Sequence, residues 1–273
     1  MIEEKAHGGY QTTIAIGAMP IGFHSQSREF ITMLEARYAG FVGAPAAASL
    51  WLEVEVIEPS RNPAEVELEV GYHGGRWIMN RGDFHAEWDP AARRGSVRQT
   101  VNPYSIDSVI RILHSIELAR GAGGFLLHSA SAVRNGRGFL FSGVSGAGKT
   151  TISRLAPPDV TLLTDEISYV RRAADGAGYQ LFGTPFAGEL GIPGDNVAAP
   201  LAALYLLAQG ADNRAVPLEG APAVRRLMRN ILFFADDAAL VEGLFRAACE
   251  FVARVPVFEL TFRRDAKVWD LIR

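Results

Sequence analysis

A glycine-rich segment near the middle of the chain has the residue types and spacing that suit phosphate binding. It follows the apolar run 138–142 and consists of Gly143, Val144, Ser145, Gly146, Ala147, Gly148, Lys149, Thr150 and Thr151. The glycines allow backbone N–H groups to turn toward phosphate oxygens without clashes from Cβ atoms. Lys149 adds a positive charge, and Thr150 adds a hydroxyl where a phosphate-bound Mg²⁺ needs one more oxygen. A strand, this loop and a helix in sequence therefore predict binding of ATP with Mg²⁺.

Two acidic residues follow at a distance that suits the same site. The apolar run 160–164 leads directly into Asp165 and Glu166. We expect a short helix after the loop, ended by Pro157-Pro158, and then a strand beside the loop strand that carries the acids to the phosphates. One carboxylate can hold Mg²⁺ while the other accepts the proton of an attacking hydroxyl. The alternative is a turn at the end of a strand, with exposed acids.

A histidine upstream can be placed by the register of a hairpin. The segments 125–134 and 137–142 flank Asn135-Gly136, a strong signal for a two-residue β-turn. If residue 134 pairs with residue 137, His128 lies opposite Gly143 at the mouth of the loop. There His128 could donate a hydrogen bond to a phosphate oxygen. The alternative is a packed histidine of the core.

Other polar residues have weaker claims to the site. The run 183–189 contains two glycines and a proline and ends in Glu189, which could approach the metal; a purely structural turn fits this run equally well. A guanidinium group would stabilise a transferring phosphoryl group. The candidates are Arg171, Arg172, Arg225, Arg226 and Arg229. The last three also fit a solvated basic face on a helix.

The first third of the chain is predicted to hold strands and one helix. Apolar patterns and turn signals predict strands over 12–23, 50–56, 65–70, 76–80, 84–88 and 96–101. The helix is predicted over 27–42, with Phe30, Leu34, Tyr38, Phe41 and Val42 on one stripe and with Gly43 and Pro45 ending it. We place a domain boundary near Pro103.

The remainder is predicted to alternate between helices and strands. A helix begins at Ser105 as the N-cap and ends before Gly121, and its buried residues are predicted from helical spacing to be Ile106, Val109, Ile110, Leu113 and Ile116. Further helices are expected from Pro222, over 237–254 and around 268–272, with a strand over 255–263 between the last two.

Composition sets limits on the class of protein. The chain has 273 residues, of which 48% are hydrophobic and 21% charged, and its net charge is −3. Scattered basic residues and a near-neutral charge argue against nucleic acid and anionic membranes as partners. The single cysteine, Cys249, fits a reducing compartment. Acids at positions 3 and 4 and the absence of a long apolar segment argue against a signal peptide and a membrane span, so we predict a cytoplasmic location.

Three motifs in order resemble the HPr kinase/phosphorylase and phosphoenolpyruvate carboxykinase-like group of P-loop proteins. They are Leu127-His128-Ser129, the loop 143–151 and Leu163-Thr164-Asp165-Glu166. The Gly183-Thr184-Pro185 run is more similar still to small HPr-kinase-like proteins encoded in peptide-modification clusters, including kinases of lasso-peptide precursors. The resemblance is clear from about residue 125 to residue 189 and absent from the first hundred residues.

The resemblance implies roles for individual residues. His128 and Lys149 would contact the phosphates, Asp165 would act as general base toward a serine hydroxyl, and Thr150 would bind Mg²⁺. Thr150 stands where the family has serine, and Glu166 where it has a second aspartate. The family's arginine–glycine signature is not found downstream of the acids, so the implied activity does not extend to HPr itself or to the reverse, phosphorylase reaction.

These observations together predict an α/β protein. Residues 104–273 would form an HPr-kinase-like P-loop domain with a mixed sheet, preceded by a smaller α+β domain over 1–103. The predicted function is transfer of the γ-phosphate of ATP to a hydroxyl, most simply a serine of a peptide or small protein. The alternatives are a nucleotide-sensing module and a kinase for a small molecule. Lys149, His128 and Asp165 are the predicted catalytic residues, and Thr150, Glu166 and Glu189 the predicted metal ligands. The oligomeric state is left open, a homo-oligomer included.

Overall fold

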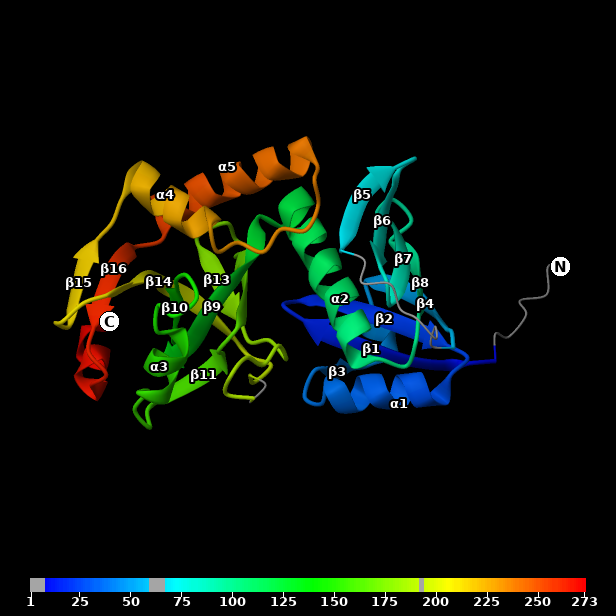
Figure 1. Cartoon of the computed structure of the whole chain (residues 1–273), viewed down its shortest axis with the longest axis horizontal. Coiled ribbons are helices and arrows are strands. Elements are labelled where there is room, and N and C mark those ends of the chain that lie inside the picture. The colour runs from blue at the N-terminus through cyan, green and yellow to red at the C-terminus, as the bar shows by residue number, and fades with distance from the viewer. Residues whose placement is uncertain (1–7, 59–66, 192–193) are drawn as a thin grey trace. The chain divides into compact units, whose positions relative to one another are not determined.

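The computed structural model describes residues 8–58, 67–191 and 194–273. It shows a mixed α/β protein with two large mixed sheets (Figure 1). The chain divides into two compact units. Unit 1 comprises the described residues up to Leu113 together with Phe234–Asp237, and unit 2 comprises His114–Phe233 and Ala238–Arg273.

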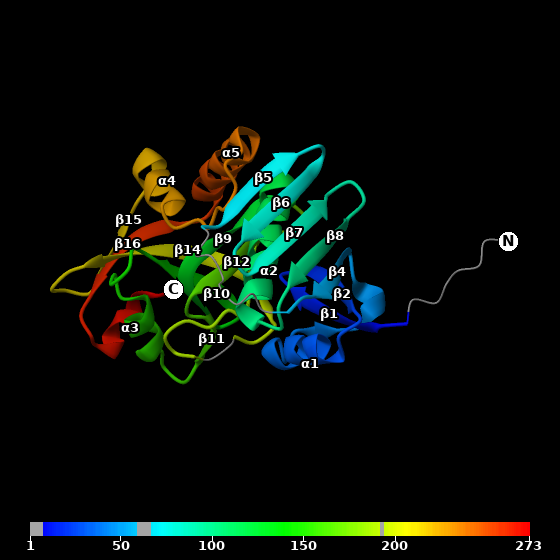
Figure 2. The same cartoon turned by 45° about the vertical axis from the view of Figure 1, so that its right-hand side comes forward.

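Unit 1 contains an eight-stranded sheet with the order β3-β1-β2-β4-β8-β7-β6-β5. Its strands are β1 (Tyr10–Ile16), β2 (Met19–Ser25), β3 (Val42–Gly43), β4 (Leu50–Val56), β5 (Glu69–His73), β6 (Arg76–Arg81), β7 (Phe84–Asp89) and β8 (Arg94–Gln99). Strands β5 to β8 form an antiparallel meander, visible as adjacent arrows in Figure 2. The pairs β2–β4 and β4–β8 are parallel. Helix α1 (Arg28–Arg37) connects β2 to β3, and a 3₁₀ turn (Pro45–Ala47) connects β3 to β4.

Unit 2 contains the second sheet, in the order β10-β9-β12-β13-β14-β16-β15, with β11 also paired to β9. The strands are β9 (Gly124–Arg134), β10 (Arg137–Ser142), β11 (Val160–Thr164), β12 (Ile167–Arg172), β13 (Tyr179–Phe182), β14 (Ala198–Gln209), β15 (Arg214–Pro217) and β16 (Val257–Phe262). Because β10 pairs with both β9 and β14, the strands β9, β12, β13, β14 and β10 close a ring. The strands β10, β14 and β16 are parallel, so their carboxyl ends meet at one edge.

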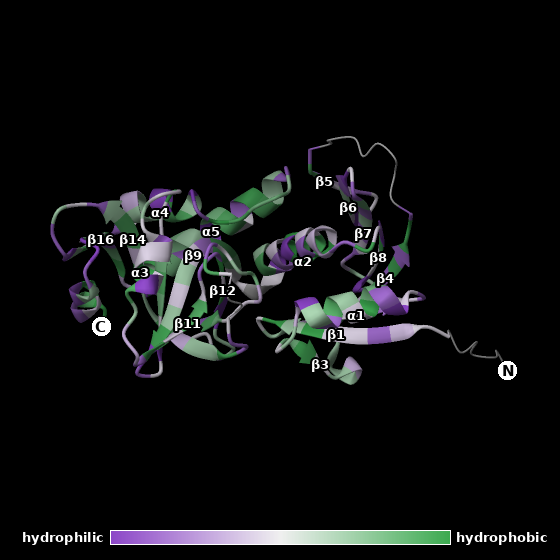
Figure 3. Ribbon diagram, turned by 60° about the horizontal axis from the view of Figure 1, so that its bottom comes forward, coloured by the Kyte–Doolittle hydropathy of each residue, from purple (hydrophilic) through white to green (hydrophobic). Residues whose placement is uncertain are grey.

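Helices cover both faces of the unit 2 sheet. One apolar cluster joins the sheet to α4 (Gly220–Met228) and α5 (Ala238–Arg254). The other joins it to α3 (Lys149–Arg154) and a 3₁₀ helix (Ala266–Leu271). The strands between these layers are largely hydrophobic, as Figure 3 shows for β11, β14 and β16. Strands buried on both faces read as continuous apolar runs, which explains the composition of β14.

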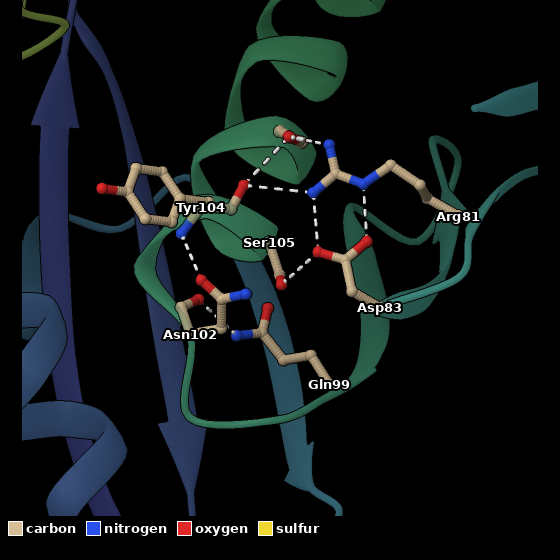
Figure 4. Close-up of polar contacts among 7 residues, drawn as sticks. Arg81, Asp83, Gln99, Asn102, Tyr104 and Ser105 are labelled. Atoms are coloured by element: carbon tan, nitrogen blue, oxygen red, sulfur yellow. Dashed lines mark hydrogen bonds and ion pairs between the residues drawn. The ribbon is translucent and has the colours of Figure 1, made fainter. Parts of the chain in front are cut away.

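Helix α2 (Pro103–Glu117) is followed by a π-helical turn (Leu118–Ala122). Five α2 residues predicted to be buried are less than 2% exposed, namely Ile106, Val109, Ile110, Leu113 and Ile116. The predicted N-cap is wrong, because α2 begins at Pro103 and the Ser105 hydroxyl donates to Asp83 Oδ2 at 2.6 Å (Figure 4). Arg81 also binds that carboxylate, through Nε at 2.5 Å and Nη2 at 2.7 Å. Ser105 therefore links α2 to the β6–β7 turn.

Several other predictions in unit 1 need correction. The segment 12–23 is two strands, β1 and β2, joined by a turn in which Gly17 and Ala18 both have a φ of 60°. Helix α1 ends at Arg37, well before the predicted end, and the chain turns at Gly40, where φ is 87°. Val42 lies in β3 and is 46% exposed, although the other four residues of the predicted stripe are buried. Strand β5 begins at Glu69, and the predicted strand residues 65–66 lie outside the described residues.

In unit 2 the predicted hairpin is confirmed, with Arg134 paired to Arg137 and Ser129 to Ser142. The short helix after the loop is confirmed as α3, and the helix 237–254 as α5. Strand β11 forms where predicted, but it lies beside β9 and not beside the loop strand β10. Strands β12, β13, β14 and β15 were not predicted. None of the helices in the described ranges combines the length and apolar character that crossing a bilayer requires.

Candidate functional site

The glycine-rich loop connects the end of β10 to the start of α3. Gly146 and Gly148 have φ values of 76° and 110°, which L side chains rarely adopt. A Cβ atom at Gly148 would also lie 2.8 Å from the ring of Phe262 on β16. Within the described part of the chain no side chain caps α3 at Gly148, so the first N–H groups of the helix remain available to an anion.

A cleft of about 610 Å³ opens beside this loop. The loop residues lining it are Ser145, Gly146, Gly148, Lys149, Thr150 and Thr151. From elsewhere in unit 2 come His128, Asp165, Glu166, Glu189 and Arg264, with Ala187 and Gly188. Of the predicted nucleotide-binding residues, Gly143, Val144 and Ala147 do not line the cleft. All the predicted catalytic residues and metal ligands do.

Lys149 lies at the base of the cleft and is only 9% exposed. Its Nζ donates to the carbonyl oxygen of Gly143 at 2.9 Å and to that of Val144 at 3.4 Å. Burial lowers the pKa of the Lys149 ammonium, and the nearby Glu189 carboxylate raises it in part. The carbonyl groups hold the ammonium inside the loop without neutralising it, so it can be offered to an anionic ligand.

His128 lies on β9, one position beyond the last hairpin pair, as predicted. Its backbone N–H donates to the carbonyl of Asn230 at 2.8 Å, and its carbonyl accepts from Ser142 Oγ at 2.9 Å. Half-burial lowers the pKa of the imidazole and the positive charge of Lys149 lowers it further, while a hydrogen bond with the backbone of Glu166 raises it in part. The ring is therefore neutral at pH 7, when it can donate one hydrogen bond and accept another.

Asp165 is tied to the loop that carries Glu189. Its Oδ1 accepts from the N–H of Gly188 and its Oδ2 from the N–H of Leu190, each at 2.8 Å. A Cβ atom at Gly188 would lie 3.0 Å from Oδ2, so this approach suits glycine. Asp165 is 6% exposed. Its ionised carboxylate has further lone pairs besides the two that accept these hydrogen bonds. Asp165 thus fixes the 187–190 segment against the cleft.

The acidic pair directly follows the end of β11, as predicted, and lies in the short gap between β11 and β12. Strands β11 and β12 run consecutively along β9, and the register shifts between Leu162 and Thr164. The Thr164 hydroxyl accepts from the backbone N–H groups of Glu166 and Ile167 at 3.2 and 3.3 Å. Such bulges re-aim side chains. This one places Asp165 and Glu166 beside the loop although β9 separates β11 from β10.

Arg264 was not predicted as a site residue. It is exposed, lies two residues past β16 and lines the cleft. Among the residues that the structure describes, it has no hydrogen-bonding or ion-pair partner. The sequence feature that could have indicated Arg264 is its place in the pair Arg263-Arg264 directly after a strand. Only the parallel order of β10, β14 and β16 reveals that this strand ends at the same edge as the loop.

None of the arginines named from the sequence lines the cleft. Arg226 forms an ion pair with Glu259 on β16, and Arg172 lies 3.4 Å from Glu250 on α5. Arg225 and Arg229 line a separate groove over α4 and α5. Their positions follow from α4 and β12 packing away from the loop.

The cleft contains few metal-binding groups. Across the described ranges, no three His, Cys, Asp or Glu side chains are arranged to hold a metal ion. Thr150, Glu166 and Glu189 nevertheless line the cleft together and offer one hydroxyl and two carboxylates. Mg²⁺ is commonly bound by one or two carboxylates with the remaining ligands from phosphate and water. The donor set therefore fits Mg²⁺ brought in with a polyphosphate.

Fold and site together define a mixed α/β protein with one cleft built on a glycine-rich loop. The model of the family described as SynChlorMet cassette protein ScmC matches residues 97–273. The match covers more than half of the chain, and the chain belongs to this family. It includes α2, both sheet faces of unit 2 and every residue of the cleft. Comparison with curated proteins finds no match.

Proposed function

We propose that the chain transfers the γ-phosphate of ATP to a hydroxyl group, most simply a serine hydroxyl of a peptide or small protein. Unit 2 would then be a P-loop domain of HPr-kinase-like architecture. The observation that carries the proposal is the convergence of Lys149, His128, Asp165 and Arg264 with the glycine-rich loop in one cleft. Donors for a polyphosphate and acceptors for a proton are the two sets of groups that phosphoryl transfer requires.

The donors act by position and charge. Backbone N–H groups of the loop and the Lys149 ammonium would bind the β- and γ-phosphates. Arg264 would bind equatorial oxygens of the transferring phosphoryl group, where its unpaired guanidinium stabilises developing charge. Neutral His128 has one ring N–H, which would reach a phosphate oxygen in place of the backbone of Glu166.

The proton acceptor is assigned to Asp165. As the bond between the γ-phosphorus and the β,γ-bridging oxygen breaks, the acceptor oxygen bonds to phosphorus and its proton passes to the carboxylate, leaving ADP. The hydrogen bonds from Gly188 and Leu190 would hold that carboxylate in a fixed orientation. Mg²⁺, held by Thr150, Glu166 and Glu189, would neutralise phosphate charge when bound.

A nucleotide-sensing module is the second candidate, and one observation favours it. Both oxygens of Asp165 already accept backbone hydrogen bonds, which is the arrangement of a carboxylate whose role is to hold a loop. In such a module ATP binding would be retained and turnover would be negligible.

Two measurements test the proposal. Calorimetry with ATP and MgCl₂ should show binding to the full chain, and lack of heat in wild type would overturn both candidates. Incubation with γ-labelled ATP and synthetic serine peptides should then move label to phosphoserine. Binding without loss of label from ATP would favour the sensor.

A further inference from the structure

Unit 2 has a second and larger hollow, distant in sequence from the glycine-rich loop. It is an apolar groove of about 1420 Å³ over α4, α5 and the start of β16. The apolar residues that line it include Val224, Met228, Cys249, Val252 and Phe258, and Phe245 lines it while 53% exposed. Pockets for small molecules usually hold about 300–1,000 Å³. The groove is the size of a site for a chain segment.

The charges around the groove are mainly positive. Arg225, Arg229 and Arg254 line it with one carboxylate, Glu219. Arg225 lies in the last turn of α4, and Arg229, four residues later, is its C-cap, so both lie on the same side of the helix. Within the described chain neither side chain has a hydrogen-bonding or ion-pair partner. Arg254 donates only to the carbonyl of Gly176, at 3.1 Å. A partner with apolar side chains flanked by carboxylates matches both the lining and the charge.

The groove is connected to the cleft through the segment that ends α4. Arg229 lines the groove, and the next residue, Asn230, accepts a hydrogen bond from the backbone of His128 in the cleft. Leu232 N–H likewise donates to Leu126 at 2.9 Å, and Ile231 forms a bridge with Leu127. One short segment, 229–232, thus lines the groove at one end and is hydrogen-bonded to strand β9 of the cleft along the rest.

We infer that this groove docks the acceptor: an acidic, apolar segment of a peptide chain that carries the reacting serine. Its apolar side chains bind over α4 and α5, and its carboxylates bind Arg225 and Arg229. Phosphorylation of the serine rests on the proposed function, whereas docking of the peptide requires neither ATP nor turnover.

The test begins with selection of peptides from a random display library of 12-residue segments on the full wild-type chain. We expect the enriched peptides to combine Asp or Glu with large apolar residues. A synthetic, fluorescein-labelled copy should bind wild type, and the double variant Arg225→Glu/Arg229→Glu should bind it at least about 10-fold more weakly. Arg246→Glu is the matched control, because Arg246 lies on α5, pairs with Glu242 and does not line the groove.

The only cysteine supplies an independent readout. Cys249 is partly exposed and lines the groove, so bound peptide should slow its alkylation by N-ethylmaleimide. The protection should disappear in the double arginine variant. Phe245→Ala, a change on the exposed rim, should weaken binding without reversing charge.

The outcomes separate docking from catalysis. Lys149→Ala should keep peptide binding even where ATP binding is lost, and a chain that binds the peptide but not ATP would retain this inference while losing the proposed function. Three results would overturn the inference: no enriched acidic peptide, equal affinity in wild type and the arginine variant, or concentration-dependent self-association that blocks Cys249 and is abolished by Phe245→Glu. The last would assign the groove to a second copy.

Discussion

The charged residues of unit 1 and those of the unit 2 cleft differ in their partners. In unit 1, Arg81 binds Asp83, Arg37 binds Asp107 and Arg98 binds Glu55. In the cleft, Lys149 contacts only backbone carbonyls, and Arg264 has no partner within the described residues.

The difference distinguishes structural charges from those available to a ligand. A paired charge has its electrostatic energy largely satisfied inside the protein and contributes to stability. Unpaired charges gathered in a concave site gain most from an external ligand of opposite charge. The comparison therefore supports the proposal that a ligand binds in the cleft, and it predicts that substitutions in the two regions affect different measurements.

The largest effect is expected for Lys149→Ala. Loss of the ammonium should remove detectable binding of ATP with Mg²⁺ and lower loss of γ-label from ATP at least about 10³-fold. Calorimetry and label release measure the two quantities. Wild-type affinity in this variant would mean that the loop does not bind the phosphates.

Arg264→Gln should lower γ-phosphate transfer by about 10²–10³-fold and change ATP affinity much less, because the guanidinium acts mainly on the transferring group. Arg263→Gln is the matched control, since Arg263 is occupied by Asp212 at 2.6 Å and by the carbonyl of Ala211. Equal loss in both variants would indicate a general effect of charge on this turn.

Asp165→Asn should keep ATP binding and lower transfer by about 10²-fold. Asparagine retains one oxygen for Gly188 or Leu190 and loses the other acceptor, so the free energy of unfolding should also fall by about 1–3 kcal/mol. Chemical denaturation and label release measure these effects on one sample. Unchanged transfer with lowered stability would give Asp165 a purely structural role.

Asp83→Asn should test the contrasting region. Arg81 and Ser105 hold the pKa of Asp83 below its usual 3.8, so the ion pair stabilises the fold above that pH and the contribution is lost as pH falls through the lowered pKa. Because the pair is partly exposed, we expect a loss of about 1 kcal/mol at pH 7 by urea denaturation. ATP affinity should not change, and a parallel loss would contradict the separation of roles.

The smallest effect at pH 7 is expected from His114, a buried neutral residue that belongs to neither group of charges and whose influence grows only on acidification. Complete burial lowers its pKa to about 3, so above that pH the folded chain keeps it neutral while the unfolded chain binds a proton below about pH 6.5. Stability should therefore fall on acidification from pH 6.5, by up to about 1.4 kcal/mol per pH unit. His114→Phe should flatten this slope in urea titrations at several pH values. Identical slopes in wild type and His114→Phe would contradict a neutral His114.

Local patterns in the sequence predicted much of unit 2. The Asn135-Gly136 turn determined the hairpin register because both residues tolerate positive φ, at 52° and 71°. Helical spacing located the buried residues of α2, and the proline pair ended α3. Strand β14 was missed because its apolar run has no alternation, as expected of a strand buried on both faces.

The sequence by itself determined the glycine-rich loop, the hairpin that brings His128 to it and the acidic pair that follows, since each depends on neighbouring residues. The tertiary structure decided which strands lie side by side. The pairing of β11 with β9 and of β16 with β14 brought the acids and Arg264 to the cleft and took the other arginines elsewhere. Strand order depends on contacts between segments far apart in the chain, and no local pattern encodes them.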